Sequence, residues 1–192
     1  LESRIRADHP YRRRLSETRA RFGAMAYPGS PLIAALTLRD MDSQTLCELH
    51  PQEHDALRQN LHDFPVFFRK EDGFQHALSI TPPTPRRGLL LCDPSYEVKE
   101  DYVNIPKHFA AMARKWNVGI LVLWYPLLTS GAHEEMLAQM VANHPGALRH
   151  EVRFPPVRDG HRMIGSGMFV VNPPYGTDIA AKEISNLFKG LK

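Results

Sequence analysis

A continuous apolar run, Gly88-Leu89-Leu90-Leu91-Cys92, is the feature that most narrows the possible folds of this chain. The run stops at Asp93-Pro94, and a short apolar stretch of this kind is typical of a strand buried on both faces of a parallel sheet. Parallel strands need a crossover connection, usually a helix, between them. The rest of the sequence should therefore alternate between strands and helices.

The remaining apolar patterns do alternate in this way. A helical pattern opens at His50-Pro51, and the last two strand-like runs flank a loop, which favours an antiparallel pair at the end of the sheet. The predicted strands are 45–49, 66–69, 88–92, 118–124, 148–154 and 167–171, and further helices are predicted at 32–39, 75–78, 102–115 and 132–143. The sequence therefore predicts a three-layer α/β domain with a mostly parallel sheet and an antiparallel C-terminal strand.

Composition places the chain among ordinary globular proteins. Its 192 residues suit one domain, with 43% hydrophobic and 23% charged residues. No apolar run approaches the roughly 20 residues that span a bilayer, and the first residues contain no apolar signal region. Cys47 and Cys92 lie in strand-like runs, which indicates buried, reduced thiols. We expect a cytoplasmic, monomeric protein without membrane contact.

The positive charge of the chain is concentrated near its N-terminus. Residues 1–25 hold three acidic residues and seven arginines: Arg4, Arg6, Arg12, Arg13, Arg14, Arg19 and Arg21. Such a segment can steer a polyanion, or it can be a helix with a solvated arginine-rich face. We predict a basic helical segment over residues 1–26, followed by a core over residues 27–192.

Two polar motifs follow predicted strands, where the carboxyl ends of parallel strands border the ligand crevice. Glu48 can accept both hydroxyl hydrogens of a nucleoside ribose, although a structural role is the alternative. Asp72 can accept from an exocyclic amine while Gly73 lets the backbone approach a flat ring; alternatively, the two residues form a capped turn. Neither motif is decisive by itself.

Asp93-Pro94-Ser95-Tyr96 follows the most apolar strand and carries the most specific chemistry. The N6 amine of adenine is a poor nucleophile, because its lone pair is delocalised into the ring. Asp93 and the carbonyl of Pro94 can accept the amine hydrogens, and Tyr96 can stack on the base. Without context the motif would be a turn, but its position after Glu48 and Asp72-Gly73 favours a site.

The combination of motifs resembles the bacterial 23S ribosomal RNA adenine-N6 methyltransferases, also labelled as proteins for the use of external DNA. The resemblance extends from about residue 25 to residue 175 and rests on residues 27–31, 48–51, 72–74, 86–97 and 123–126. It implies a class I, S-adenosylmethionine-dependent enzyme with a seven-stranded Rossmann-like sheet that methylates ribosomal RNA. No metal is expected, and a DNA adenine methyltransferase or a non-catalytic nucleic-acid-binding remnant stays open.

The resemblance also implies roles for individual residues. Ser30 and Glu48 would contact the cofactor, Asp72 and Gly73 would hold its adenine end, and Asp93 would border the cofactor and accept from the target amine. Pro94 and Tyr96 would complete the catalytic set. Each of these residues occupies the matching position of a family motif in this sequence.

Two departures from the family pattern stand out. Ser95 replaces the second proline of the usual Asp-Pro-Pro-Tyr motif. The His-rich start, the first strand and its Gly-rich loop are also missing, so residues 1–26 would be the end of an insertion subdomain. We expect residues 1–192 alone to bind the cofactor poorly.

Three further groups have competing interpretations. Asn172-Pro173-Pro174-Tyr175 looks like a methyltransferase motif, but only 17 residues follow it, too few for the elements that should succeed a central catalytic strand. Trp124 is expected in the core, whereas Tyr125 and Pro126 could frame the base. Arg158, His161 and Arg162 could meet RNA phosphate or form a solvated loop.

Overall fold

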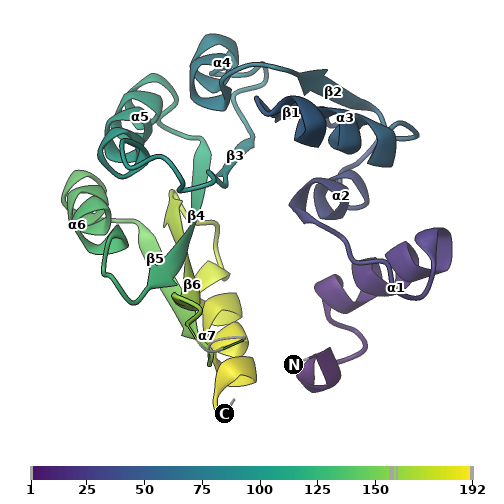
Figure 1. The fold of residues 1–192 in the computed structure, drawn as a ribbon. Helices are drawn as coiled ribbons and strands as arrows, with labels where there is room; N and C mark the ends of the chain where they lie inside the picture. The colour runs from purple at the N-terminus through teal and green to yellow at the C-terminus, as the bar shows by residue number, and fades with distance from the viewer. Residues whose placement is uncertain (1, 156–157, 159, 191–192) are drawn as a thin grey trace. The chain divides into compact units, whose positions relative to one another are not determined.

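The computed structural model describes residues 2–155, 158 and 160–190. The chain divides into two compact units, Leu1–Ser79 and Ile80–Lys192, which are taken in turn. Strands and helices alternate in both units (Figure 1), which confirms the α/β fold class predicted from the sequence. These units divide after Ser79, not after residue 26. The boundary expected after residue 26 stays a prediction.

The first unit is built around a short parallel pair of strands. β1 pairs with β2 from Gln44↔Val66 to Cys47↔Arg69, so both strands end at the same edge. Leu15, Leu61 and Ala77 are buried in this unit. Its elements are η1 (Glu2–Arg4), α1 (Pro10–Phe22), α2 (Ser30–Ala35), β1 (Gln44–Cys47), α3 (Pro51–Asn60), β2 (Val66–Arg69) and α4 (Gly73–Ile80).

Arg19 and Arg21 of α1 contact residues of their own unit. Arg19 forms a bidentate ion pair with Glu2, with Nη1 and Nη2 at 2.7 and 3.0 Å from the carboxylate oxygens. The Arg21 guanidinium lies 3.1 Å from Asp63 and 4.6 Å from the centre of the Phe64 ring. These contacts favour a structural helix face over a free basic patch.

The second unit contains a four-stranded sheet in the order β3-β4-β6-β5. β3 runs parallel to β4, and β6 runs antiparallel to both β4 and β5. Only β6 is therefore reversed, which confirms the mostly parallel sheet with an antiparallel C-terminal strand. The elements are β3 (Leu89–Cys92), α5 (Asp101–Lys115), β4 (Ile120–Leu128), α6 (His133–Asn143), β5 (Leu148–Arg153), β6 (Met163–Val171) and α7 (Thr177–Phe188).

Helices cover both faces of this sheet. His150 in β5 lies 2.8 Å from the hydroxyl of Ser185 in α7. The next residue, Glu151, accepts a hydrogen bond from Tyr125, whose ring stacks on His133 in α6. Because successive strand residues point to opposite faces, α6 and α7 lie on opposite sides of the sheet (Figure 1), forming three layers.

Burial within the sheet differs between its centre and its edge. Leu121 and Leu123 of β4 are fully buried, whereas Leu89 and Leu91 of β3 are 59% and 41% exposed. The expectation that β3 is buried on both faces is therefore wrong for this unit, because, among the strands of the described residues, β3 is an edge strand that pairs only with β4.

Two local features shape the sheet and its helices. Tyr125 pairs with Gly167, and a β-carbon at Gly167 would collide with the Tyr125 ring. In α5, Pro106 lies inside the helix. Since proline has no N–H, Pro106 cannot donate to the carbonyl of Tyr102 four residues earlier.

Candidate functional site

Asp93 begins the loop that leaves the carboxyl end of β3. Cys92 is in register with Leu123, so Asp93 follows β3 at the level of Trp124. The Asp93 side chain is exposed, yet partial burial of its carboxylate raises its pKa. Burial, together with the charge of Asp93, also raises the pKa of the Cys92 thiol to about 12. Asp93 is thus an accessible carboxylate that is a stronger base than a free aspartate.

Tyr96 is held tightly in the same loop. Its backbone φ is 57°, in the left-handed region, and its hydroxyl donates to the carbonyl oxygen of Trp124 at 2.6 Å. The Tyr96 ring centre lies 5.2 Å from that of Tyr102 and 6.3 Å from that of Trp124. Tyr102 was not expected at this site from the sequence, where its signal is an aromatic residue soon after the Asp-Pro-Ser-Tyr motif.

The structure reverses the expectation for the neighbouring residues Trp124 and Tyr125. Tyr125 is fully buried, and its hydroxyl donates to Glu151 at 3.0 Å. Trp124 is half-buried and lies beside Tyr96. The expectation of Trp124 in the core with Tyr125 at the crevice is therefore wrong. Tyr125 points toward α6, and Trp124 points to the opposite face of the sheet because side chains alternate along a strand.

The carboxyl edge of β1 and β2 brings together Glu48, Asp72 and Gly73. Glu48 follows β1, and its Oε1 accepts from the backbone N–H of His50 at 2.7 Å. Asp72 Oδ1 accepts from the N–H of Gln75 at 2.9 Å, so Asp72 caps the start of α4. A β-carbon on Gly73 would lie 3.5 Å from the Cys47 β-carbon. The capped turn considered for Asp72 is present, and its role toward a ligand stays a prediction.

Ser30 has the weakest connection to this edge. It is the first residue of α2 and is exposed. A contact between α2 and the sheet is the hydrogen bond from Gln44 Nε2 to the Pro31 carbonyl, at 3.0 Å. Gln44 begins β1 and Glu48 follows its other end, so this contact lies away from Glu48. The cofactor contact of Ser30 stays a prediction.

Asn172-Pro173-Pro174-Tyr175 lies at the opposite end of the second unit's sheet from Asp93. Val171 pairs with Leu121 at the start of β4, whereas Asp93 follows the carboxyl end of β3. The Asn172 amide donates to the carbonyls of Asn117 and Gly119, at 3.0 and 2.8 Å. These contacts give Asn172 a structural role, and the choice of Asp93 over Asn172 as the catalytic residue stays a prediction.

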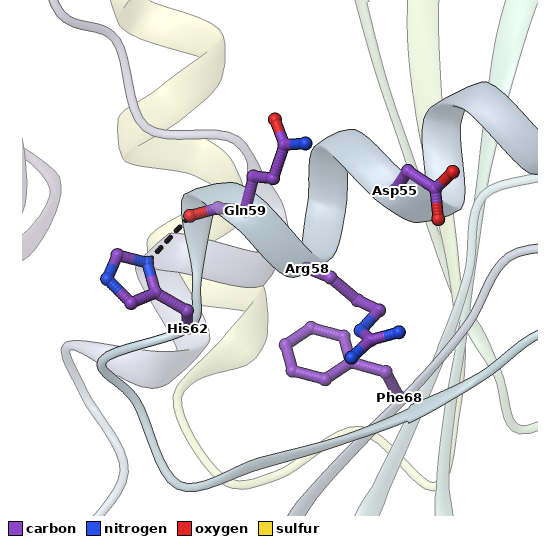
Figure 2. Close-up of a pocket in the computed structure, with 5 residues that line it drawn as sticks. All are labelled: Asp55, Arg58, Gln59, His62 and Phe68. Carbon is purple, nitrogen blue, oxygen red and sulfur yellow. Dashed lines mark hydrogen bonds between the residues drawn. The ribbon is translucent and has the colours of Figure 1, made fainter.

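A surface hollow in the first unit contains none of the predicted site residues. Figure 2 shows its lining residues on α3, on the turn after it and on β2: Asp55, Arg58, Gln59, His62 and Phe68. His62 Nδ1 lies 2.8 Å from the carbonyl oxygen of Gln59. The hollow carries charges of both signs, and these contacts do not indicate a particular ligand.

The described residues contain neither a metal-ion cluster nor a membrane-spanning helix. Within the described ranges, no three His, Cys, Asp or Glu side chains cluster closely enough to hold a metal ion. In the same part of the chain, no helix is both long and apolar enough to cross a membrane. Of the loop residues considered for RNA contact, Arg158, His161 and Arg162 are described, but residues 156, 157 and 159 lie outside the described set.

Comparison with known proteins identifies the family. Residues 16–190 match the family described as Ribosomal RNA large subunit methyltransferase D, RlmJ. The chain belongs to this family. Among RlmJ relatives, Ribosomal RNA large subunit methyltransferase J of Escherichia coli K12 is 40% identical over 78% of this chain and 54% of its own length. The protein of the same name from Haemophilus influenzae is 37% identical over 82% of this chain and 57% of its own.

Solved structures agree with the α/β fold of this chain. Protein LPL1258 of Legionella pneumophila has a TM-score of 0.82 at 31% identity, over 92% of this chain and 66% of its own. A Klebsiella pneumoniae structure described as an O-methyltransferase has a TM-score of 0.51 at 14% identity, over 88% of this chain and 92% of its own, and shows the fold alone. The chain spans about half the length of the curated RlmJ relatives.

Proposed function

We propose that this chain provides most of the catalytic part of an S-adenosylmethionine-dependent methyltransferase that modifies adenine N6 in large-subunit ribosomal RNA. Its membership of the RlmJ family supports the reaction class. The observation that carries the proposal is the accessible Asp93, beside a Tyr96 ring held in place at the carboxyl edge of β3. Such an edge is where open α/β sheets bind their ligands.

In this proposal, residues of the loop after β3 prepare the target amine. Asp93 and the carbonyl of Pro94 accept the two N6 hydrogens and localise the nitrogen lone pair. A carboxylate is too weak a base to deprotonate a neutral arylamine fully, so Asp93 takes the proton as the new bond forms. The raised pKa of Asp93 assists this step because it makes the carboxylate a better acceptor. Tyr96 stacks on the adenine and fixes its plane.

The carboxyl edge of β1 and β2 suits a nucleoside-containing cofactor. A carboxylate has about four lone-pair positions, and the hydrogen bond to Glu48 Oε1 from His50 leaves acceptor capacity for ribose hydroxyls. Asp72 likewise uses Oδ1 for its cap, and the adjoining Gly73 has no side chain. S-adenosylmethionine, when bound, supplies a methyl group activated by the positive charge on its sulfur. Ser30, the exposed first residue of α2, is also assigned to the cofactor in this proposal.

The proposal is tested by methyl transfer from labelled cofactor in the full-length protein. Asp93→Ala should slow transfer by roughly a hundredfold or more while leaving RNA affinity nearly unchanged, because general acid–base groups contribute about that much. The matched control Asp178→Ala removes a carboxylate that is paired with Lys182 on α7 and should leave the rate unchanged. An unaltered rate in Asp93→Ala would remove Asp93 from the reaction.

Substrate choice distinguishes the alternative functions. Protein-free ribosomal RNA should be methylated faster than duplex DNA, because unpaired adenines expose N6 without the unstacking cost. Equal rates on both substrates would favour a DNA adenine methyltransferase. Absence of transfer to either, with nucleic-acid binding retained, would favour a non-catalytic binding protein.

A further inference from the structure

The backbone at Tyr96 is unusual for an aromatic residue. Its φ of 57° lies in the left-handed region, which bulky residues rarely adopt. Such a conformation persists only where the surrounding structure holds it in place. The contacts of the Tyr96 side chain should therefore explain why the loop keeps this geometry.

Contacts from two other elements hold the side chain. Its hydroxyl donates to the carbonyl oxygen of Trp124, in the middle of β4, at 2.6 Å. Its ring lies against Tyr102, in the first turn of α5, with the planes inclined at 44°, and against Trp124 at 58°. The centre-to-centre distances of 5.2 and 6.3 Å lie within the range of roughly 4.5–7 Å over which aromatic rings interact favourably. Burial raises the pKa of Tyr96, so its hydroxyl stays a donor at neutral pH.

We infer that Tyr102 and Trp124 are positioning residues that hold the Tyr96 ring in one orientation before the target base arrives. Together the rings of Tyr96, Tyr102 and Trp124 form an aromatic platform at the carboxyl end of β3, beside the middle of β4. This inference rests on the proposed function, because the flat ligand is taken to be an unpaired adenine of RNA. It adds residues outside the Asp-Pro-Ser-Tyr motif to the determinants of base binding.

The platform has an energetic consequence for binding. A tyrosine that is free to rotate loses that freedom when a base stacks on it, whereas a ring held beforehand does not. The saving in rotational entropy of the Tyr96 ring applies equally to the bound substrate and to the transition state. Removal of the support should therefore change the KM for RNA more than kcat.

Steady-state methylation by variants of the full-length protein provides the first test. Tyr102→Ala should raise the KM for RNA roughly three- to tenfold, with kcat within about twofold, and Tyr102→Phe should restore it because the ring makes the contact. A merely structural role would lower the folded fraction and the apparent kcat without altering KM. An unchanged KM in Tyr102→Ala would overturn the inference.

Two variants complete this test. Tyr96→Phe keeps the ring but removes the hydroxyl that donates to the Trp124 carbonyl, so it should also raise the KM for RNA. If Tyr102→Ala does not fold, the KM of Tyr96→Phe tests the platform in its place. Tyr175→Ala is the matched control, since Tyr175 is 103% exposed and follows β6 at the opposite edge of the sheet. Equal KM values for Tyr96→Phe and the unmodified protein would count against the platform.

Tryptophan fluorescence tests the platform independently of methyl transfer. The sequence has two tryptophans, so Trp116→Phe leaves Trp124 as the fluorescent reporter in this chain. Trp116 itself is only 3% exposed. An oligoribonucleotide with one unpaired adenine should quench Trp124 more than an all-uridine oligomer, and Tyr102→Ala should weaken this binding roughly three- to tenfold. Quenching without methyl transfer would refute the proposed function and retain the platform. Methyl transfer without adenine-dependent quenching would retain the proposed function and refute the platform.

Discussion

Replacement of Asn172 by alanine should destabilise the protein without slowing methyl transfer. The Asn172 amide donates to the carbonyls of Asn117 and Gly119. At about 0.5–1.5 kcal/mol each, the two hydrogen bonds contribute about 1–3 kcal/mol. The backbone φ of 54° adds about 1 kcal/mol, because alanine disfavours the left-handed region that asparagine tolerates. The free energy of unfolding should therefore fall by about 2–4 kcal/mol.

Urea unfolding of the full-length protein measures this loss. With a slope of about 2 kcal/mol per molar urea, the midpoint should fall by about 1–2 M. Asn172→Gly separates the two contributions, because glycine accepts the positive φ and loses only the hydrogen bonds. Equal midpoints for the Ala and Gly variants would refute the backbone contribution. Loss of transfer in folded Asn172→Ala, with transfer retained in Asp93→Ala, would make Asn172 the catalytic residue.

Three further outcomes are expected. Glu48→Ala should weaken S-adenosylmethionine binding by roughly 1.5–3 kcal/mol, the scale of charge-assisted hydrogen bonds, and calorimetry showing unchanged affinity in the folded variant would remove Glu48 from the site. Gly167→Ala should lower the free energy of unfolding by about 1–3 kcal/mol or more, because the added β-carbon overlaps the buried Tyr125 ring. Gly146→Ala is the control: its added carbon meets open space, so the same urea experiment should show little change in the free energy of unfolding. Since burial raises the pKa of Cys92 to about 12, alkylation at pH 8.5 followed by mass spectrometry should find it far less reactive than a free cysteine with pKa near 9; rapid modification would contradict its burial.

The alternation of elements was predictable because its signals are local. Four apolar residues before Asp93 became β3, and His50-Pro51 marked the start of α3. Asp72 shows a limit of the same reasoning, since a cap and a ligand contact require the same residue type at the same place. Its Oδ1 serves as a cap, and its second oxygen remains compatible with the predicted ligand.

Side-chain direction in β4 was not predictable from its own residues. Alternation requires that Trp124 and Tyr125 face opposite sides, but it does not say which residue faces the site. The missing information lies in two other strands: Gly167 of β6, opposite Tyr125, provides room for the ring, and Glu151 of β5 accepts a hydrogen bond from its hydroxyl. A glycine within a predicted strand signals such a close approach, and it could have placed Tyr125 in the core.

Pro106 makes the start of α5 separable from the rest of the helix. Because no N–H reaches the Tyr102 carbonyl from residue 106, the first turn is joined to the following turns by one fewer hydrogen bond. Opening of that turn therefore leaves the buried part of α5, at Phe109 and Met112, in place. Amide hydrogens around Val103 and Asn104 should exchange with solvent well before those near Met112. One ring of the aromatic platform, Tyr102, is thus carried by a turn that can open locally while the sheet stays folded.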